Sequence, residues 1–233
     1  MKKVFSGTIV FLVIVFSFTC RNKELSSGQL MDAAWSLFKE GNFKKAIYVV
    51  NESILIDSSN EYAYLLKGIS WKMLNDKRAA IDAYRKALKV NPKSPLANFS
   101  IGIDFWVNGS LDSSLVYYEN ALNGKLKPSI NMYFDLTKNK FTRMEDWLVP
   151  STYEIRHFRG LASYDMGLDA NALIDFEYSL DGKYDIGESC YYLGKIYLER
   201  GRMDKACYYF TQAISVKHDI PYEIKTKIKN CLE

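Results

Sequence analysis

The chain has 233 residues, of which 48% are hydrophobic, 15% aromatic and 25% charged. These fractions are typical of a globular protein and exclude wholesale disorder, collagen and a multi-span membrane protein. Lys2 and Lys3 lie in a segment that we expect to be removed, and without them 29 of the 31 basic residues face 27 acidic ones, a net charge of +2. A near-neutral chain without a long basic run argues against a nucleic-acid partner.

Residues 1–19 have the pattern of an export signal. Lys2 and Lys3 form a basic start, and an apolar run follows from residue 9 to residue 19. A membrane-spanning helix needs about 20 apolar residues, so this run is short for a span and has the size of a signal. We therefore predict a signal peptide over residues 1–19 and an exported protein.

Cys20 stands where the apolar run ends and polar chain begins. A cysteine at this junction resembles a bacterial lipoprotein signal, although Ser17, Phe18 and Thr19 depart from the usual residues before it. The resemblance implies palmitate or a similar lipid on Cys20, a polar tether over residues 20–28, and a membrane-anchored lipoprotein on the periplasmic or outer-membrane side. An uncleaved signal anchor and cleavage by ordinary signal peptidase stay open, and both also export the chain.

A period of 34 residues organises the rest of the chain. Small residues recur at Ala34, Gly68, Gly102, Gly160 and Gly194, and turn residues recur at Gly41, Asn75, Gly109, Gly167 and Gly201. Bulky apolar residues recur at Val50, Tyr84, Tyr118, Phe176 and Phe210. Small residues let two antiparallel helices approach closely, a bulky residue fills the space beside them, and Gly or Asn ends the first helix at the turn. The columns therefore predict five helical hairpins.

This pattern resembles the tetratricopeptide repeat. The second copy is closest, because Gly68, Trp71, Ala80 and Tyr84 fall on family positions. The resemblance implies an all-α, helix-turn-helix repeat solenoid, with repeats 1–3 over residues 27–128 and repeats 4–5 over residues 153–220. The expected copies are residues 27–60, 61–94, 95–128, 153–186 and 187–220. In the fourth copy Arg156 and Arg159 replace expected apolar residues.

Two segments lie outside the repeats. Residues 129–152 interrupt the period, and they contain Tyr133, Phe134, Phe141 and Trp147. We predict that this aromatic-rich insertion forms one or two short helices on the array, as a space-filling half-repeat or as a lid or partner-binding feature. Residues 221–233 place Ile224, Ile228 and Leu232 four apart, which predicts an amphipathic helix that caps the array.

The sequence holds no catalytic constellation. His157 and His218 are the two histidines, neither lies in a metal-spaced cluster, and phosphate-loop and nucleophile-elbow motifs are absent. We therefore expect a protein that is not an enzyme and needs no cofactor or metal. In an oxidising compartment Cys207 could pair with Cys190 or with Cys231, and the alternative is three buried thiols.

The family resemblance implies that the first helices line a concave groove. Its predicted lining residues are Met31, Trp35, Phe38, Tyr62, Leu65, Ile69, Met73, Phe99, Ile103, Trp106, Tyr191 and Lys195. The N-terminal half of this set is apolar and aromatic, which suits a partner's helix or peptide if the groove is open, and a core if it is closed. We predict a non-catalytic protein–protein interaction scaffold or adaptor of a cell-envelope assembly complex. The alternative is a binder of a small apolar ligand or lipid in a pocket closed by residues 129–152. The sequence names neither the partner nor the oligomeric state.

Overall fold

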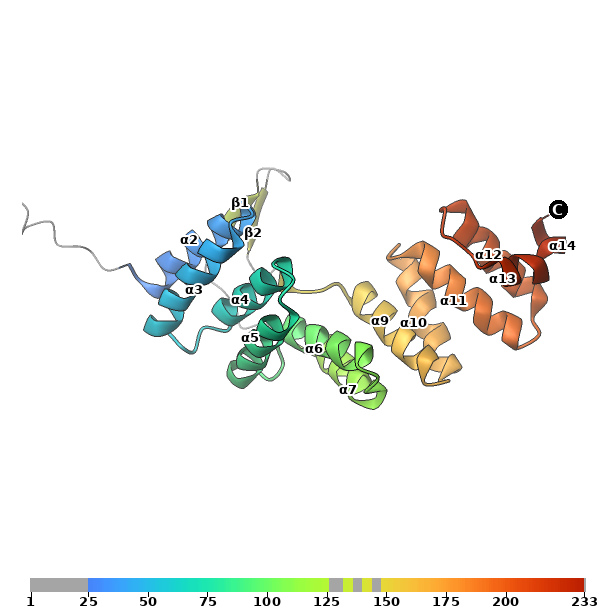
Figure 1. Cartoon of the computed structure of the whole chain (residues 1–233), viewed down its shortest axis with the longest axis horizontal. Coiled ribbons are helices and arrows are strands. Elements are labelled where there is room, and N and C mark those ends of the chain that lie inside the picture. The colour runs from blue at the N-terminus through green and yellow to red at the C-terminus, as the bar shows by residue number, and fades with distance from the viewer. Residues whose placement is uncertain (1–24, 126–131, 136–139, 144–147, 233) are drawn as a thin grey trace, which may run out of the picture.

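The computed structural model describes residues 25–125, 132–135, 140–143 and 148–232, and the described chain is an elongated array of paired helices (Figure 1). The pairs are α2 (Ser27–Lys39) with α3 (Phe43–Ile56), α4 (Glu61–Met73) with α5 (Lys77–Val90), α6 (Pro95–Val107) with α7 (Leu111–Leu122), α9 (Thr152–Asp165) with α10 (Asp169–Asp181), and α11 (Ile186–Glu199) with α12 (Met203–Ser215). The predicted all-α repeat solenoid is confirmed. Among the described residues, no helix has the length and apolar character needed to span a bilayer. The predicted signal peptide and Cys20 lie outside the described residues.

The 34-residue columns meet inside each hairpin. A Cβ atom on Gly68 would lie 2.5 Å from Cε1 of Tyr84, and one on Gly194 would lie 2.8 Å from Cε1 of Phe210. Both rings are almost completely buried. The first helix therefore touches an aromatic ring of the second through bare backbone, which explains why the column admits only small residues.

The turns between paired helices use a left-handed residue at the same place. Gly41 has φ +78° and Asn75 has φ 61°. Glycine adopts this conformation without steric cost, and asparagine tolerates it better than most residues do. Each turn thereby ends its first helix after about the same number of residues and keeps the hairpins alike.

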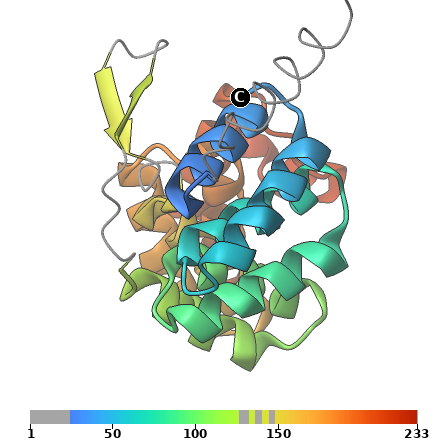
Figure 2. The same ribbon diagram turned by 90° about the vertical axis from the view of Figure 1, so that its left-hand side faces the viewer.

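Consecutive repeats stay stacked across the insertion. Phe99, Tyr118, Ile155 and Ala162 belong to one buried cluster, which joins α6 and α7 to α9. Helix α7 thus packs on α9 as α3 packs on α4, although residues 123–151 intervene. Figure 2 views the array from its N-terminal end, with the later repeats behind the first.

Two described segments of the insertion, residues 132–135 and 140–143, are strands and not helices. Strands β1 (Met132–Asp135) and β2 (Lys140–Arg143) pair antiparallel, with Met132 opposite Arg143 and Asp135 opposite Lys140. The prediction of helices over residues 129–152 is therefore wrong for these strands. Tyr133, Phe134 and Phe141 are aromatic, and such residues favour an extended chain when they occur in short runs. Trp147 lies outside the described residues.

The end of the insertion returns to the first two repeats. Leu148 is completely buried, and it belongs to the same apolar cluster as Met31, Trp35 and Leu66. Pro150 is buried as well, just before α9 begins. The insertion therefore covers part of the first-helix side of repeats 1 and 2.

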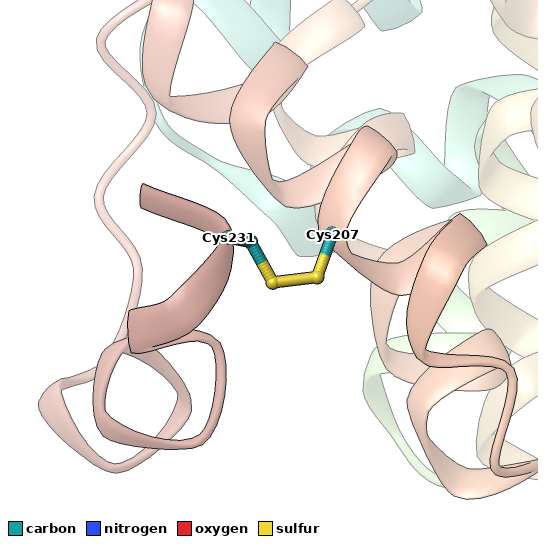
Figure 3. Close-up of a disulfide and its surroundings, with 2 residues drawn as sticks. All are labelled: Cys207 and Cys231. Atoms are coloured by element: carbon teal, nitrogen blue, oxygen red, sulfur yellow. A yellow bond between two sulfur atoms is a disulfide. The ribbon is translucent and has the colours of Figure 1, made fainter. Parts of the chain in front are cut away.

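The C-terminal segment closes the other end of the array. It forms two short helices, α13 (Tyr222–Lys227) and α14 (Lys229–Leu232), where we predicted one capping helix. Ile220 and Ile228 are buried against Phe210 of α12. A disulfide joins Cys207 to Cys231 with 5.6 Å between their Cα atoms, and Figure 3 shows how it ties the cap to α12. Of the alternatives predicted for the cysteines, the structure has the Cys207–Cys231 pair. Cys190 is a free, buried thiol.

Replacement of Cys231 by serine is expected to loosen the cap. The disulfide closes a loop of 24 residues, and a crosslink of this size contributes about 3 kcal/mol to stability. The measurement is hydrogen exchange at Phe210 and Ala213, with and without reductant. Wild type should lose protection when reductant is added, whereas Cys231→Ser should be unprotected throughout.

Cys190→Ala is the matched control, because it removes a cysteine but leaves the disulfide. It should keep the response of wild type to reductant. Equal protection of wild type and Cys231→Ser under oxidising conditions would show that the disulfide does not hold the cap.

Candidate functional site

Four of the predicted groove residues are buried. Met31 and Trp35 are each 2% exposed, Leu65 is 0% exposed and Phe99 is 4% exposed. The prediction that these four side chains line an open groove is therefore wrong. Leu148 of the insertion joins the cluster that contains Met31, Trp35 and Leu65, and Phe99 packs in the next cluster along the array. These residues are core.

Most of the other predicted groove residues pack partly against this core. Phe38, Tyr62, Ile69, Ile103 and Trp106 are half-buried, whereas Met73 is 55% exposed. The Trp106 indole Nε1 donates a hydrogen bond to Asp165 Oδ2 at 2.7 Å. This bond joins α6 to α9 across the insertion.

Beyond Trp106, aromatic rings gather around one ammonium group. Lys195 Nζ lies 4.8 Å from the ring centre of Tyr164 and 5.6 Å from those of Tyr191 and Tyr192. The Tyr164 hydroxyl donates to Glu199 Oε1 at 3.1 Å. We call Tyr164, Tyr191 and Tyr192 the tyrosine cluster. A cation over an aromatic face is stabilised by about 0.5–2 kcal/mol, depending on how dry the contact is.

Sequence reasoning found part of this arrangement. Tyr191 and Lys195 were predicted groove residues, and the structure brings them together on α11. Tyr192 was not predicted, because it falls outside the family's inward-facing positions, yet its ring stacks on Phe176 at 5.4 Å and turns toward Tyr164 at 5.0 Å. Only the approach of α9 to α11 in the structure places it there.

The surroundings of the tyrosine cluster are acidic. Asp165 and Glu199 are exposed, and Glu188 is partly exposed. Burial raises the pKa of Tyr192 to about 12, and burial followed by the charge of Glu199 raises the pKa of Tyr164. Both hydroxyls are therefore neutral at physiological pH, and the surface presents aromatic faces beside carboxylates.

His157 is buried between the two first helices of this region. It is 1% exposed, its Nε2 lies 2.9 Å from Glu188 Oε2, and its Nδ1 lies 3.0 Å from Ser189 Oγ. The hydrogen bond with His157 lowers the pKa of Glu188, and burial opposes that shift. These contacts fasten α9 to α11 and fix the spacing of the tyrosine cluster.

One group of metal-ligating atoms occurs in the described part of the chain. Ligand atoms of His157, Asp185 and Glu188 all lie within 4.8 Å of one another. The sequence did not predict this group, because His157 belongs to a different repeat from Glu188. Asp185 already accepts a hydrogen bond from the Glu188 backbone N–H at 3.1 Å, and His157 is bound to Glu188. Protein partners thus satisfy these groups, and nothing in their geometry calls for an ion.

The two arginines that depart from the family pattern form a buried ion-pair cluster. Asp175 is 1% exposed and accepts hydrogen bonds from Arg159 Nε and NH2 at 2.7 Å each, and from Arg156 NH1 at 3.0 Å. Arg159 also pairs with Glu119 of α7. Hydrogen bonds to Asp175 raise the pKa of Arg159. Repeats 3 and 4 are therefore joined by charge as well as by apolar packing.

A cleft of about 540 Å³ lies next to this ion-pair cluster. Its lining residues come from α7, α9 and α10 and include Leu115, Val116, Arg159 and Ile174. Val116 and Ile174 are 60% and 59% exposed, so the cleft is on the outer side of the array. None of its lining residues is a described residue of the insertion.

Replacement of Asp175 by alanine is expected to destabilise the pairing of α9 with α10 in repeat 4. Removing one partner of a buried ion pair costs roughly 3 kcal/mol or more, because the remaining charges lose their partner. The measurement is the free energy of unfolding in urea, followed by circular dichroism. Glu177→Ala is the control, since Glu177 is exposed on the same helix. Equal effects of the two substitutions would contradict the assignment.

Comparison with known proteins agrees with this architecture. Family profiles described as tetratricopeptide repeat match residues 74–129 and 187–219. A TPR repeat-containing protein of Methanocaldococcus jannaschii is 34% identical over 91 residues, which cover 39% of this chain and 16% of that protein. The chain therefore matches only a small part of this relative's length.

Solved structures share the fold at low identity. YrrB, described as a TPR protein with an unusual peptide-binding site, aligns with a TM-score of 0.63 and 18% identity over 92% of this chain and 97% of its own. PilW, described as a type IV pilus biogenesis factor, aligns with a TM-score of 0.59 and 19% identity over 88% and 86%. The Pseudomonas aeruginosa pilF product aligns with a TM-score of 0.58 and 16% identity over 81% and 75%. The solved structures share the fold, and the two profile matches together with the Methanocaldococcus jannaschii relative identify the chain as a tetratricopeptide-repeat protein.

Proposed function

We propose that this protein is a membrane-anchored scaffold that binds a segment of a partner protein on the first-helix side of α9 and α11. Tetratricopeptide-repeat proteins are generally non-catalytic scaffolds for contacts between proteins. The observation that carries the proposal is the tyrosine cluster around Lys195, because it is a half-buried aromatic surface outside the buried cluster that Leu148 joins.

The chemistry of this surface defines the segment it would take. Tyrosine side chains give large contact areas at low cost in rotamer entropy, and they are enriched among residues that dominate binding energy. Asp165 and Glu199 lie beside the rings and favour a segment with lysine or arginine side chains. The ring faces already hold the ammonium of Lys195, so a partner's cation would find the same environment.

Membrane anchoring is the second part of the proposal. Residues 1–19 resemble a signal peptide and Cys20 stands at its end. The Cys207–Cys231 disulfide supports export, because disulfides persist in oxidising compartments and are rare in the cytosol. An anchor on Cys20 would raise the effective concentration of the scaffold near membrane partners. We place the protein on the periplasmic or outer-membrane side, as part of a cell-envelope assembly complex.

Two structural neighbours have descriptions that fit this class of function. YrrB is described with a peptide-binding site, and PilW as a pilus biogenesis factor. Within the described residues, the 540 Å³ cleft lies on the outer side of the array and is lined by α7, α9 and α10, so this cleft does not correspond to the small-ligand alternative. A pocket closed by the insertion would need lining residues from that segment.

The partner surface is tested by crosslinking the full chain in membranes and identifying the captured proteins by mass spectrometry. We expect the double variant Tyr164→Ser, Tyr191→Ser to capture one protein at least about tenfold less than wild type does. A loss of this size is usual when two aromatic anchors are removed. Tyr208→Ser with Tyr222→Ser is the matched control, since both tyrosines are exposed and lie outside the tyrosine cluster. Unchanged helical content verifies folding of both double variants. Equal capture by the two would remove the tyrosine cluster as the partner site.

The anchor is tested by labelling cells with a palmitate analogue. Wild type should incorporate the label and remain with membranes after a salt wash, and Cys20→Ser should do neither, because the acylated thiol is gone. Cys190→Ser keeps Cys20 and should behave as wild type. Label on Cys20→Ser, or a mature N-terminus at another residue, would contradict the lipoprotein assignment.

A further inference from the structure

The second helices of the repeats differ sharply in charge. Helix α5 carries Lys77, Arg78, Arg85, Lys86 and Lys89 against the single acid Asp82, a net charge of +4. Helix α10 carries four acidic residues and no basic residue, a net charge of −4. All the charged residues of α5 are exposed, so its charge faces solvent. The positive charge of α5 is not needed for the fold, because this helix packs through buried alanines and Tyr84.

The charges of α5 are largely uncompensated. Among the described residues, the ion pair recorded for α5 is the one between Arg85 and Asp82, at 3.8 Å with both side chains more than half exposed. A surface pair of this kind contributes about 0–1 kcal/mol. The other basic side chains of the helix thus remain available to a separate anion.

A further lysine extends this surface from α5 to α3. Lys67 of α4 donates a hydrogen bond to Asn51 Oδ1 of α3 at 2.6 Å. Partial burial lowers the pKa of Lys67, and the nearby charge of Lys86 lowers it further. Lys67 therefore lies between α3 and α5, with an ammonium group rather than a carboxylate beside it.

Helix α3 adds apolar side chains to the same side. Lys44, Tyr48, Asn51 and Leu55 recur at helical spacing, so they share one face, and Asn51 connects that face to Lys67. Tyr48 is 67% exposed and Leu55 is 79% exposed. A surface that combines basic and large apolar side chains suits the interface of a lipid bilayer. We call Lys44, Tyr48, Leu55, Lys67, Lys86 and Lys89 the basic face.

The position of the basic face in the chain agrees with this chemistry. The proposed anchor, Cys20, is separated from the start of α2 at Ser27 by only six residues. An extended chain of seven residue steps spans at most roughly 25 Å. The first two repeats would therefore be held next to the bilayer, whereas the acidic α10 belongs to the fourth repeat (Figure 1).

We propose that the basic face docks repeats 1 and 2 onto an anionic phospholipid surface. The inference uses the proposed Cys20 anchor to bring the face to the bilayer, and goes beyond it by assigning the face that lies on the lipid. Each lysine or arginine close to an anionic surface strengthens binding about fivefold, the equivalent of 1 kcal/mol. Docking would leave the tyrosine cluster of repeats 4 and 5 directed away from the anchor point.

The test is a lysine footprint of the full chain reconstituted into vesicles. One set of vesicles is phosphatidylcholine alone, and the other is phosphatidylcholine mixed with phosphatidylglycerol. An amine-reactive reagent and mass spectrometry report the exposure of each lysine. Lys44, Lys86 and Lys89 should react several-fold more slowly on the anionic vesicles, and high salt should abolish the difference. Lys205 and Lys217 in the last repeat are the internal controls and should react equally on both.

Two double charge reversals test whether the basic face itself binds the lipid or whether any basic residue of the chain would do so. Lys86→Glu with Lys89→Glu should remove the protection of Lys44, whereas Lys205→Glu with Lys217→Glu should leave it unchanged. Protection of Lys44 that is equal on neutral and anionic vesicles, or that survives the α5 reversals, overturns the proposal. Self-association of wild type without vesicles that the α5 reversals abolish also overturns it, since it would assign the face to the acidic α10 of a second copy.

The outcome also separates this proposal from the anchoring one. Neutral vesicles retain the chain only through its N-terminus, so loss of the chain from neutral vesicles contradicts the anchor. Retention on both kinds of vesicle without a difference in the footprint contradicts only the basic face.

Discussion

The whole array depends on one contact that recurs in every hairpin, between a small residue of the first helix and a bulky residue of the second. A Cβ atom on Gly68 would lie 2.5 Å from the Tyr84 ring, so the two helices are as close as bare backbone allows. In the first hairpin the pair is Ala34 and Val50, both completely buried. There the added methyl group of alanine is matched by a smaller partner, which keeps the helix spacing. Because this spacing is constant, each hairpin presents the same faces to the next and the repeats stack regularly.

Regular stacking also explains how the chain tolerates an insertion between repeats 3 and 4. Tyr118 and Ile155 lie on helices that pack directly on each other, so the junction needs nothing from the residues between them. The entropy of closing a loop grows slowly with its length, so a long excursion costs little more than a short one. The insertion uses this freedom to return to the first repeats, where Leu148 is completely buried in their apolar cluster. As a result, Met31, Trp35 and Leu65 belong to the core, whereas the rings of the tyrosine cluster are only half-buried.

Repeated contacts and contacts that occur once differ in how far the sequence could predict them. The recurring columns predicted the hairpins and the repeat family, because they record contacts that are local and repeated. The burial of Trp35 and its neighbours was not predictable in the same way. Leu148 and Trp35 share one buried cluster although they are more than 100 positions apart, and this contact occurs once in the chain's described part. Arg156 and Arg159 stood out in the sequence as departures, but their partner Asp175 is fixed only by the approach of α9 to α10. The sequence did not predict the hairpin of β1 and β2. The segment is rich in aromatic residues and lies between helical repeats, so we expected it to be helical as well.

The surfaces that distinguish the two ends of the array are independent of the contact that builds it. The basic side chains of α5 point into solvent, while Ala80, Ala83, Tyr84 and Ala87 of the same helix are buried. Likewise α11 buries Leu193 and Gly194 and directs Lys195 toward the rings of the tyrosine cluster. Charge or aromatic character can therefore change on the outer positions of one repeat without altering the helix spacing of the next. An array of this kind can therefore carry a basic surface on one repeat and an aromatic surface on another, because the fold requires only one column of small residues and one column of large ones.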